Sequence, residues 1–231
     1  MCGRYALAGD WSEFVKEFGL DEVPGLSNRY NIAPSTAPGF EVPILSASDG
    51  LSFARFWYIP VWWSEPLKGL PTAFNARSET VLTKPYFKGA QACLIPTSGW
   101  REFPGPRGRK RAFHFFTTEE GQARPFFAFA GVKSVWLDPQ TGAETHTCAI
   151  LTGEPHEIVR PHHHRMPLIV DPFSYEEWIA AGSSLDELIS GAREYSRRAG
   201  LDAYECSTFG NSTRVEGGEC LAPASKQEEL F

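Results

Sequence analysis

Several common sequence features are missing from this chain of 231 residues, and each absence argues against a class of protein. No apolar run approaches the roughly 20 residues of a membrane-spanning helix, and the amino terminus lacks the basic and then apolar segments of a signal peptide. The five cysteines are scattered without a C-x-x-C spacing, which argues against a disulfide framework and against a zinc site. We therefore expect a soluble, cytoplasmic protein with no metal and no other cofactor.

Motifs of several enzyme classes are absent as well. The sequence has no glycine-rich phosphate-binding loop, no G-x-S-x-G nucleophile elbow and no H-E-x-x-H motif. The net charge of −6 argues against a wholly basic nucleic-acid-binding protein. A local basic cleft in an acidic body stays open, because binding depends on where the charge lies.

The pattern of strands and turns predicts an α+β fold. Segments rich in β-branched and aromatic residues are separated by turn residues and do not alternate regularly with helices, which disfavours a doubly wound parallel sheet. We predict a single compact domain with a mostly antiparallel, barrel-like sheet flanked by short helices. The predicted strands cover residues 3–8, 41–45, 52–59, 92–96, 112–116, 126–132, 147–152 and 168–170.

Capping residues predict three helices. The first covers residues 11–18, with Asp10 as its N-cap and Gly19 at its end. Two later helices begin at Ser174 and Ser184, each of which has a glutamate three residues further on, and end near glycines 182 and 200. We expect residues 20–38 to be irregular and periodicity to end at 202. The domain then covers residues 1–221 and a tail covers 222–231, in a protein that is a monomer.

The chain begins Met1-Cys2-Gly3-Arg4-Tyr5, and this start offers chemistry that no internal cysteine has. Removal of Met1, which a small second residue permits, leaves Cys2 with an α-amine and a thiol of ordinary pKa about 7.7–8.0 and about 8.5. The amine condenses with an aldehyde to an imine, and the thiol closes the imine into a thiazolidine. Gly3 permits close approach and Arg4 adds positive charge. The alternative is an arbitrary residue on a frayed terminus.

Two polar side chains stand in otherwise apolar segments. Asn75 could hold an amine or a sugar oxygen while Arg77 grips a phosphate; the alternative is a turn asparagine beside a surface arginine. Glu102 lies between Trp100 and Phe103, where partial desolvation raises a carboxyl pKa toward values useful in acid–base catalysis. The alternative for Glu102 is an ion pair with the neighbouring arginine at a strand edge.

The run His162-His163-His164 suggests either a metal site or a general acid–base. In an extended segment successive side chains alternate between faces, so three consecutive residues do not easily supply three converging ligands. One histidine that faces a pocket is the simpler interpretation. Trp62 and Trp63 are adjacent and can stack on unpaired bases or wedge between them; the alternative is packing, and we expect at least one of them in the core.

Taken together, seven segments resemble the motifs of one family in order and approximate spacing. The family is SRAP, the SOS-response-associated peptidase-like, abasic-site processing proteins, and the resemblance covers residues 2–170 well and the remainder weakly. The segments are Met1–Tyr5, Arg29–Pro34, Trp57–Trp62, Asn75–Thr80, Gly99–Phe103, Ala128–Val132 and His163–Pro167.

The resemblance implies that the protein binds single-stranded DNA and that Cys2 forms a thiazolidine with the ring-opened aldehyde of an abasic site, which protects the lesion during the DNA damage response. It also implies that Asn75 steadies the Cys2 amine, that Glu102 orients or exchanges protons there, and that His163 assists ring opening, imine formation and reversal. Lyase-like imine chemistry belongs to the same pathway. The matching phosphate-contacting positions are Arg4, Arg77 and Arg165.

Three positions depart from the family's usual residues. Ser98 replaces an acidic residue, Phe103 replaces a tryptophan, and His164 replaces an aspartate between His163 and Arg165. These departures bear on the rate and reversibility of the reaction more than on its class.

Other functions stay open. Cys2 could instead be the nucleophile of a cysteine peptidase, or the chain could bind single-stranded DNA without a covalent step through Trp62, Trp63 and its arginines. The chain ends Gln227-Glu228-Glu229-Leu230-Phe231, which resembles the Q-x-x-L-F peptide that docks on the replication sliding clamp, with Leu230 and Phe231 in an apolar groove and Gln227 at its rim. The alternative is a random acidic tail. On DNA the protein would be nucleoid-associated.

Overall fold

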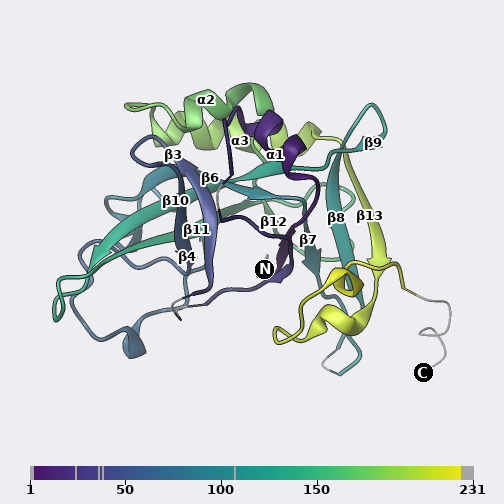
Figure 1. Cartoon of the computed structure of the whole chain (residues 1–231), viewed down its shortest axis with the longest axis horizontal. Coiled ribbons are helices and arrows are strands. Elements are labelled where there is room, and N and C mark those ends of the chain that lie inside the picture. Colours follow the sequence, from purple (N-terminus) through teal and green to yellow (C-terminus); the bar gives the residue numbers. More distant parts are fainter. Residues whose placement is uncertain (1–2, 24, 36, 38, 107, 225–231) are drawn as a thin grey trace.

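Two curved sheets form the body of the molecule, and three helices lie along its upper side (Figure 1). The computed structural model describes residues 3–23, 25–35, 37, 39–106 and 108–224. Cys2 and the clamp-like residues Gln227, Leu230 and Phe231 lie outside the described residues. Within the described residues, no helix combines the length and the apolar character that a membrane span requires.

The strands are short, and most of them pair with antiparallel neighbours. In chain order they are β1 (Tyr5–Leu7), β2 (Arg29–Ile32), β3 (Glu41–Ser46), β4 (Gly50–Phe56), β5 (Asn75–Arg77), β6 (Gln91–Thr97), β7 (Gly99–Glu102), β8 (Ala112–Glu119), β9 (Gln122–Ala123), β10 (Phe127–Leu137), β11 (Glu144–Gly153), β12 (Met166–Pro167) and β13 (Leu201–Cys206). The helices are α1 (Trp11–Phe18), α2 (Tyr175–Trp178) and α3 (Leu185–Arg198).

Five strands form a closed barrel. They follow the order β10-β6-β3-β4-β11, and the pairing of β10 with β11 closes the ring. Inward side chains alternate along the strands as the pleat requires: Val42 and Ile44 of β3 and Ala54 and Phe56 of β4 are fully buried. The parallel pairs β4–β11 and β5–β11 are the exceptions to antiparallel pairing. The predicted α+β fold with a barrel-like, mostly antiparallel sheet is confirmed.

The second sheet has the order β13-β8-β7-β1-β2 and packs against the barrel through β1. The Tyr5 ring of β1 meets the barrel rings of Phe56 and Phe129 edge-on, with centroids 5.5 and 5.9 Å away. The hydroxyl of Thr97, at the end of β6, donates to the carbonyl oxygen of Ala6 at 2.9 Å. β1 is therefore the strand of the second sheet that is fixed against the barrel.

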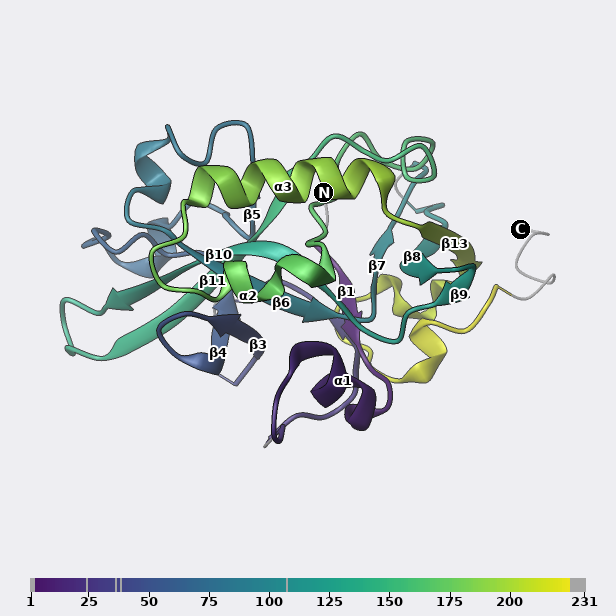
Figure 2. The same ribbon diagram turned by 90° about the horizontal axis from the view of Figure 1, so that it is seen from above.

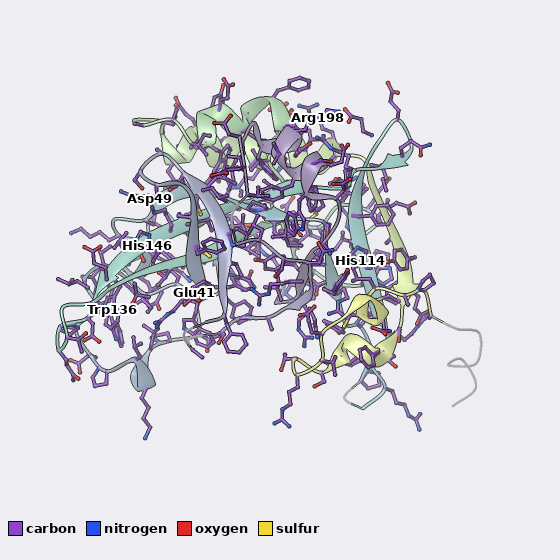
Figure 3. All side chains as sticks on the ribbon, in the orientation of Figure 1. Glu41, Asp49, His114, Trp136, His146 and Arg198 are labelled. Atoms are coloured by element: carbon purple, nitrogen blue, oxygen red, sulfur yellow. The ribbon has the colours of Figure 1, made fainter. Side chains whose placement is uncertain are left out.

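A buried lysine lies in barrel strand β10. Lys133 is fully buried, and its ammonium group donates to the hydroxyls of Ser46 and Ser48 and to the carboxylate of Asp49 around the β3–β4 turn. His146 of β11 lies 3.8 Å from the same carboxylate; it and Asp49 are labelled in Figure 3. Saturation with hydrogen-bond partners explains why a core strand tolerates this charge.

The helix starts are confirmed, whereas one helix end is not. Asp10 accepts a hydrogen bond from the backbone N–H of Ser12 and so caps α1, and Gly19 ends α1 at φ 61°. α2 and α3 begin directly after Ser174 and Ser184, although neither serine side chain makes a capping hydrogen bond. α2 has only four residues and ends well before position 182. The carbonyl oxygen of Glu177, near its end, accepts a hydrogen bond from the Ser183 hydroxyl.

Six strands of the described structure escaped prediction: β2, β5, β7, β9, β12 and β13. The expectation of an irregular segment over 20–38 is wrong at β2. Beyond 202, where we expected periodicity to end, β13 still pairs with β8, from Leu201 opposite Thr117 to Cys206 opposite Ala112. The strand predicted at 168–170 is wrong, because β12 ends at Pro167 and Ile169 forms only an isolated bridge with Phe129. β2, β5, β7 and β13 are held by backbone pairing with partners distant in sequence, which side-chain periodicity does not report. After β13 the chain stays attached as far as Ala224, whose N–H donates to Glu205.

Candidate functional site

Asn75 begins β5 and carries a buried amide that has no partner within the described residues. β5 runs parallel to barrel strand β11, with Asn75 opposite Ile150 and Arg77 opposite Thr152. Both the oxygen and the nitrogen of the Asn75 amide are buried, and neither has a hydrogen-bond partner among the described residues. Leaving a buried polar group unpaired costs about 1–3 kcal/mol. Such a group is well suited to receive a ligand.

Arg77, at the other end of β5, faces solvent. Its carbonyl oxygen accepts hydrogen bonds from the N–H groups of Thr80 and Val81 and so starts the following turn. Within the part of the chain that the structure describes, its guanidinium has no hydrogen bond and no ion pair. Arg77 is therefore a cation at a fixed backbone position, and no described residue pairs with its charge.

Glu102 ends β7 on the second sheet and is only 3% exposed. β7 runs antiparallel to β1: Trp100 lies opposite Tyr5, and the Arg101 N–H donates to the Arg4 carbonyl at 2.9 Å. Continued by one residue, this register brings Glu102 beside Gly3, the sequence neighbour of Cys2. The predicted desolvation of this carboxyl is confirmed by its burial.

The histidines lie in a turn and not in an extended segment. The N–H groups of His162 and His163 both donate to the Val159 carbonyl, at 2.8 and 3.0 Å, so the alternation argument does not apply here. The His163 Nδ1 atom lies 2.9 Å from the Arg165 carbonyl oxygen and 3.0 Å from the Arg165 backbone nitrogen, and its ring stacks on His164. Burial lowers the pKa of His163, so the imidazole is mostly neutral at neutral pH. Across the described ranges no group of His, Cys, Asp and Glu is arranged to hold a metal ion.

The turn brings the two sheets together at this end of the molecule. The His162 ring packs on Phe113 of β8 at a centroid distance of 4.1 Å, and Phe113 lies directly opposite Glu102 in the β7–β8 ladder. Arg165 then leads into β12, which pairs with the same end of β11 that holds β5. The histidine turn thus packs on the ladder that holds Glu102 and leads through β12 to the end of β11 that also holds β5.

Arg4 and Arg165 are engaged by the protein, unlike Arg77. The Arg4 guanidinium donates to the Asn31 side chain at 2.7 Å and to the carbonyls of Gly210 and Asn211 at 2.8 and 3.2 Å. Burial, and next the charge of Arg101, lower the pKa of Arg4 to about 10, so Arg4 stays charged at neutral pH. The Arg165 guanidinium binds both carboxylate oxygens of Glu79, at 2.6 and 2.8 Å.

The sequence analysis missed Arg101 as a structural partner of Arg4. Arg101 is 1% exposed and donates to the same Asn31 oxygen as Arg4 and to the Cys220 carbonyl. Both arginines lie over the ring of Phe103, at 5.2 and 5.6 Å. Asn31 belongs to the segment Arg29–Pro34, one of the seven that resemble family motifs. Its polar side chain between apolar residues is the feature of the sequence that could have indicated this role.

Comparison with known proteins assigns the family. Residues 1–212 match the family described as SOS response associated peptidase (SRAP). This chain belongs to the SRAP family. The abasic site processing protein YoqW of Bacillus subtilis (strain 168) is 26% identical over 231 residues, which cover 96% of this chain and 99% of YoqW. The abasic site processing protein HMCES of Gallus gallus is 28% identical over 191 residues, which cover 73% of this chain and 56% of HMCES.

The fold of this SRAP protein recurs in solved structures. A crystal structure of a Bacteroides thetaiotaomicron protein superimposes with a TM-score of 0.79 over 97% of this chain and 100% of that one. Its sequence identity of 22% supports the shared fold alone.

The residues that depart from the family pattern have defined places in this SRAP chain. The Ser98 hydroxyl accepts a hydrogen bond from the Ala8 N–H at 3.1 Å, so Ser98 holds the end of β1. Phe103 lies under the two arginines, and His164 stacks on His163 with ring centroids 4.4 Å apart. All three substitutions therefore adjoin the residues that frame the candidate site.

The adjacent tryptophans differ in exposure. Trp62 is 48% exposed, and its indole N–H donates to the Pro85 carbonyl at 3.2 Å. Trp63 packs against a small apolar cluster that contains Trp136, whose indole N–H donates to the Trp63 carbonyl at 2.7 Å. Trp63 is thus half-buried and Trp62 presents its ring to solvent, so the expectation that at least one of them lies in the core is wrong.

Proposed function

We propose that this SRAP protein binds single-stranded DNA that contains an abasic site and joins it covalently through Cys2, once Met1 has been removed. The observation that carries the proposal is the buried amide of Asn75, which has no partner among the described residues. The relatives YoqW and HMCES are abasic site processing proteins, and they supply the substrate class.

The reaction proceeds in two bond-forming steps. The Cys2 amine nitrogen bonds to the aldehyde carbon of the opened sugar, and loss of water gives an imine. The thiol sulfur then bonds to the same carbon while its proton passes to the nitrogen, which closes the thiazolidine. One water leaves for each cross-link, and no oxidant or metal is required.

Three side chains divide the proton transfers and the orientation. The Asn75 amide oxygen accepts a hydrogen bond from the amine and fixes the direction of its lone pair. Neutral His163 accepts a proton and returns it to the leaving hydroxyl, which its lowered pKa permits at neutral pH. The buried carboxyl of Glu102 orients the amine from the second sheet and exchanges protons with it.

The imine explains how one site relates to lyase chemistry. An imine at the sugar carbon acidifies the adjacent C–H and favours elimination of the 3′ phosphate. Closure to the thiazolidine removes the imine and so keeps the strand intact. The protected cross-link is the product we propose.

The proposed DNA-binding surface includes Arg77 and Trp62. Arg77 presents to a backbone phosphate a guanidinium that has no partner among the described residues, and Trp62 offers an exposed ring to an unpaired base. Arg4 and Arg165 contact phosphate only through N–H groups that their protein partners leave available, and Trp63 supports Trp62 from within.

A denaturing gel tests the proposal. Wild-type protein mixed with single-stranded DNA that holds one abasic site should give a heat-stable adduct, and Cys2→Ala should give none. A version with uncleaved residues before Cys2 should also give none, because the α-amine is half of the reagent. An adduct that survives Cys2→Ala overturns the nucleophile, and DNA binding without any adduct favours a non-covalent binder.

A second candidate follows from the family description. A peptidase would use the same Cys2 thiol against a peptide carbonyl. Incubation of the wild-type protein and Cys2→Ala with a mixed peptide library separates the two, because peptide cleavage that depends on Cys2 without a DNA adduct supports the peptidase.

The tail adds a proposed partner. Gln227, Leu230 and Phe231 follow Ala224, whose backbone N–H donates to the carbonyl of Glu205 in β13. We propose that it docks on the replication sliding clamp. Deletion of the last five residues should abolish clamp binding in a pull-down and leave cross-linking unchanged; clamp binding that survives the deletion contradicts this.

A further inference from the structure

We propose that Glu79 is a positioning residue that holds His163 in place through Arg165, and that it also restrains the positive charge offered to DNA. This inference rests on the proposed function, because it assigns a role in the same reaction. Glu79 follows β5 directly, two residues after Arg77. It therefore links the strand of Asn75 to the turn of His163.

The side chain of Arg165 is fixed on two sides. Both oxygens of Glu79 accept its guanidinium N–H groups, and Thr152 of β11 accepts others through its carbonyl at 2.5 Å and its hydroxyl at 3.2 Å. The Arg165 side chain is 14% exposed, and Thr152 is 3% exposed. The Thr152 carbonyl also accepts the Ser78 N–H at 3.0 Å, so the clamp is attached to the barrel and to β5 at once.

The backbone of Arg165 in turn fixes the imidazole of His163. Its nitrogen and its oxygen both lie within 3.0 Å of His163 Nδ1. The bond at Nδ1 sets the ring plane, and the Nε2 atom points away from Arg165. A movement of Arg165 therefore moves the proton-transferring atom, and misplacement of a reacting group by about 1 Å can cost roughly a hundredfold in rate.

Glu79 also balances charge. The hydrogen bonds from Arg165 lower the pKa of Glu79, so the carboxylate is ionised at neutral pH. Arg193 of α3 donates to the Ser78 hydroxyl at 3.0 Å, and its charge lowers the same pKa further. Arg165 and Arg193 thus both act on one carboxylate, which stands two residues after Arg77 in the sequence. Its neutralisation raises the local positive charge by one unit and should strengthen attraction to phosphates.

The two roles make opposite predictions for Glu79→Gln, which a purely structural role would not produce. Binding of undamaged single-stranded DNA, followed by fluorescence anisotropy, should stay as tight or become tighter. The rate of adduct formation with abasic-site DNA at saturating protein should fall by roughly ten- to a hundredfold. Glu79→Asp keeps the charge on a shorter side chain and should recover part of the rate.

The matched control is Glu17→Gln. Glu17 of α1 binds Arg124 through both oxygens at 2.8 Å, and α1 lies on the opposite side of the molecule from β5 (Figure 2). This variant should keep the wild-type affinity and rate. A wild-type rate in Glu79→Gln overturns the inference, as does a joint loss of affinity and rate with lower thermal stability. Failure of the wild-type protein to form any adduct overturns the proposed function instead.

Discussion

Two asparagines of this chain have the same side chain and opposite surroundings. Asn31 of β2 is 4% exposed and saturated: its oxygen accepts from Arg4 and Arg101, and its nitrogen donates to the carbonyls of Ser212 and Val215. Asn75 of β5 is half-buried as a residue, but its amide oxygen and nitrogen are buried and have no partner in the described ranges. The fold therefore uses one amide to hold itself together, and the proposed function uses the other to hold the ligand.

The contrast extends to the two sides of the site. On the second sheet, the charged groups make hydrogen bonds within the protein. Arg4 and Arg101 both donate to Asn31 and to backbone carbonyls of the segment after β13. On the barrel side, Arg77 and Asn75 keep their hydrogen-bonding capacity. In the proposed function, the second sheet thus frames the site and the barrel side receives the substrate.

The strongest test of this contrast is Asn31→Leu, which keeps the side-chain volume and removes four hydrogen bonds. The buried Arg101, the half-buried Arg4 and two carbonyls lose a partner, and we expect the free energy of unfolding to fall by roughly 4 kcal/mol. Urea unfolding at neutral pH measures it. A loss below about 1 kcal/mol would show that Asn31 does not hold the frame.

A pH titration of stability sharpens the account of the second sheet. His114 of β8, labelled in Figure 3, is 5% exposed, and a Cβ on Gly99 would lie 2.4 Å from its ring. Burial, and next the charge of Arg101, lower the pKa of His114 to about 4. The unfolded chain binds the proton below about pH 6.5, so stability is complete above that pH and is lost as the pH falls toward 4.

The expected loss across this window is roughly 3 kcal/mol. Urea unfolding of the wild-type protein and of His114→Gln at a series of pH values isolates it, because the variant lacks the titrating ring and should show a flatter profile. Parallel profiles for the two proteins would contradict the assignment to His114.

Asn75→Leu should separate stability from activity. An apolar side chain of similar size relieves the unpaired amide, so the free energy of unfolding should rise by about 1 kcal/mol or stay unchanged. Adduct formation should fall at least tenfold, because the amine loses its acceptor. Parallel urea unfolding and gel assays check both results. A destabilised variant would show that Asn75 has a structural partner and that the contrast with Asn31 is false.

The sequence predicted the elements that side-chain patterns mark. The helix α1 was found through its capping residues, and the barrel strands through β-branched and aromatic residues between turn residues. β2, β5, β7 and β13 were not, since their pairing depends on backbone groups of strands distant in sequence. The residues Asn75, Glu102 and His163 were found through chemistry and family motifs. Their partners Asn31, Glu79, Arg101 and Thr152 depend on three-dimensional contacts that no spacing encodes.

The smallest expected effect on stability belongs to Arg77→Gln. Arg77 has no partner in the described structure, and its substitution is compared with that of Arg4, which is hydrogen-bonded to the protein. Because the Arg77 side chain is exposed and unpaired in the described structure, its loss should change the free energy of unfolding by less than about 0.5 kcal/mol. Its loss should weaken binding of undamaged single-stranded DNA and reduce the slope of log affinity against log salt by about 0.7, the value for one phosphate contact. Arg4→Gln removes the same charge but also three hydrogen bonds to the frame, so it should lower stability and change the salt slope less. Equal slope changes in the two variants would mean that the second sheet also receives DNA, and the division between frame and receiving side would fail.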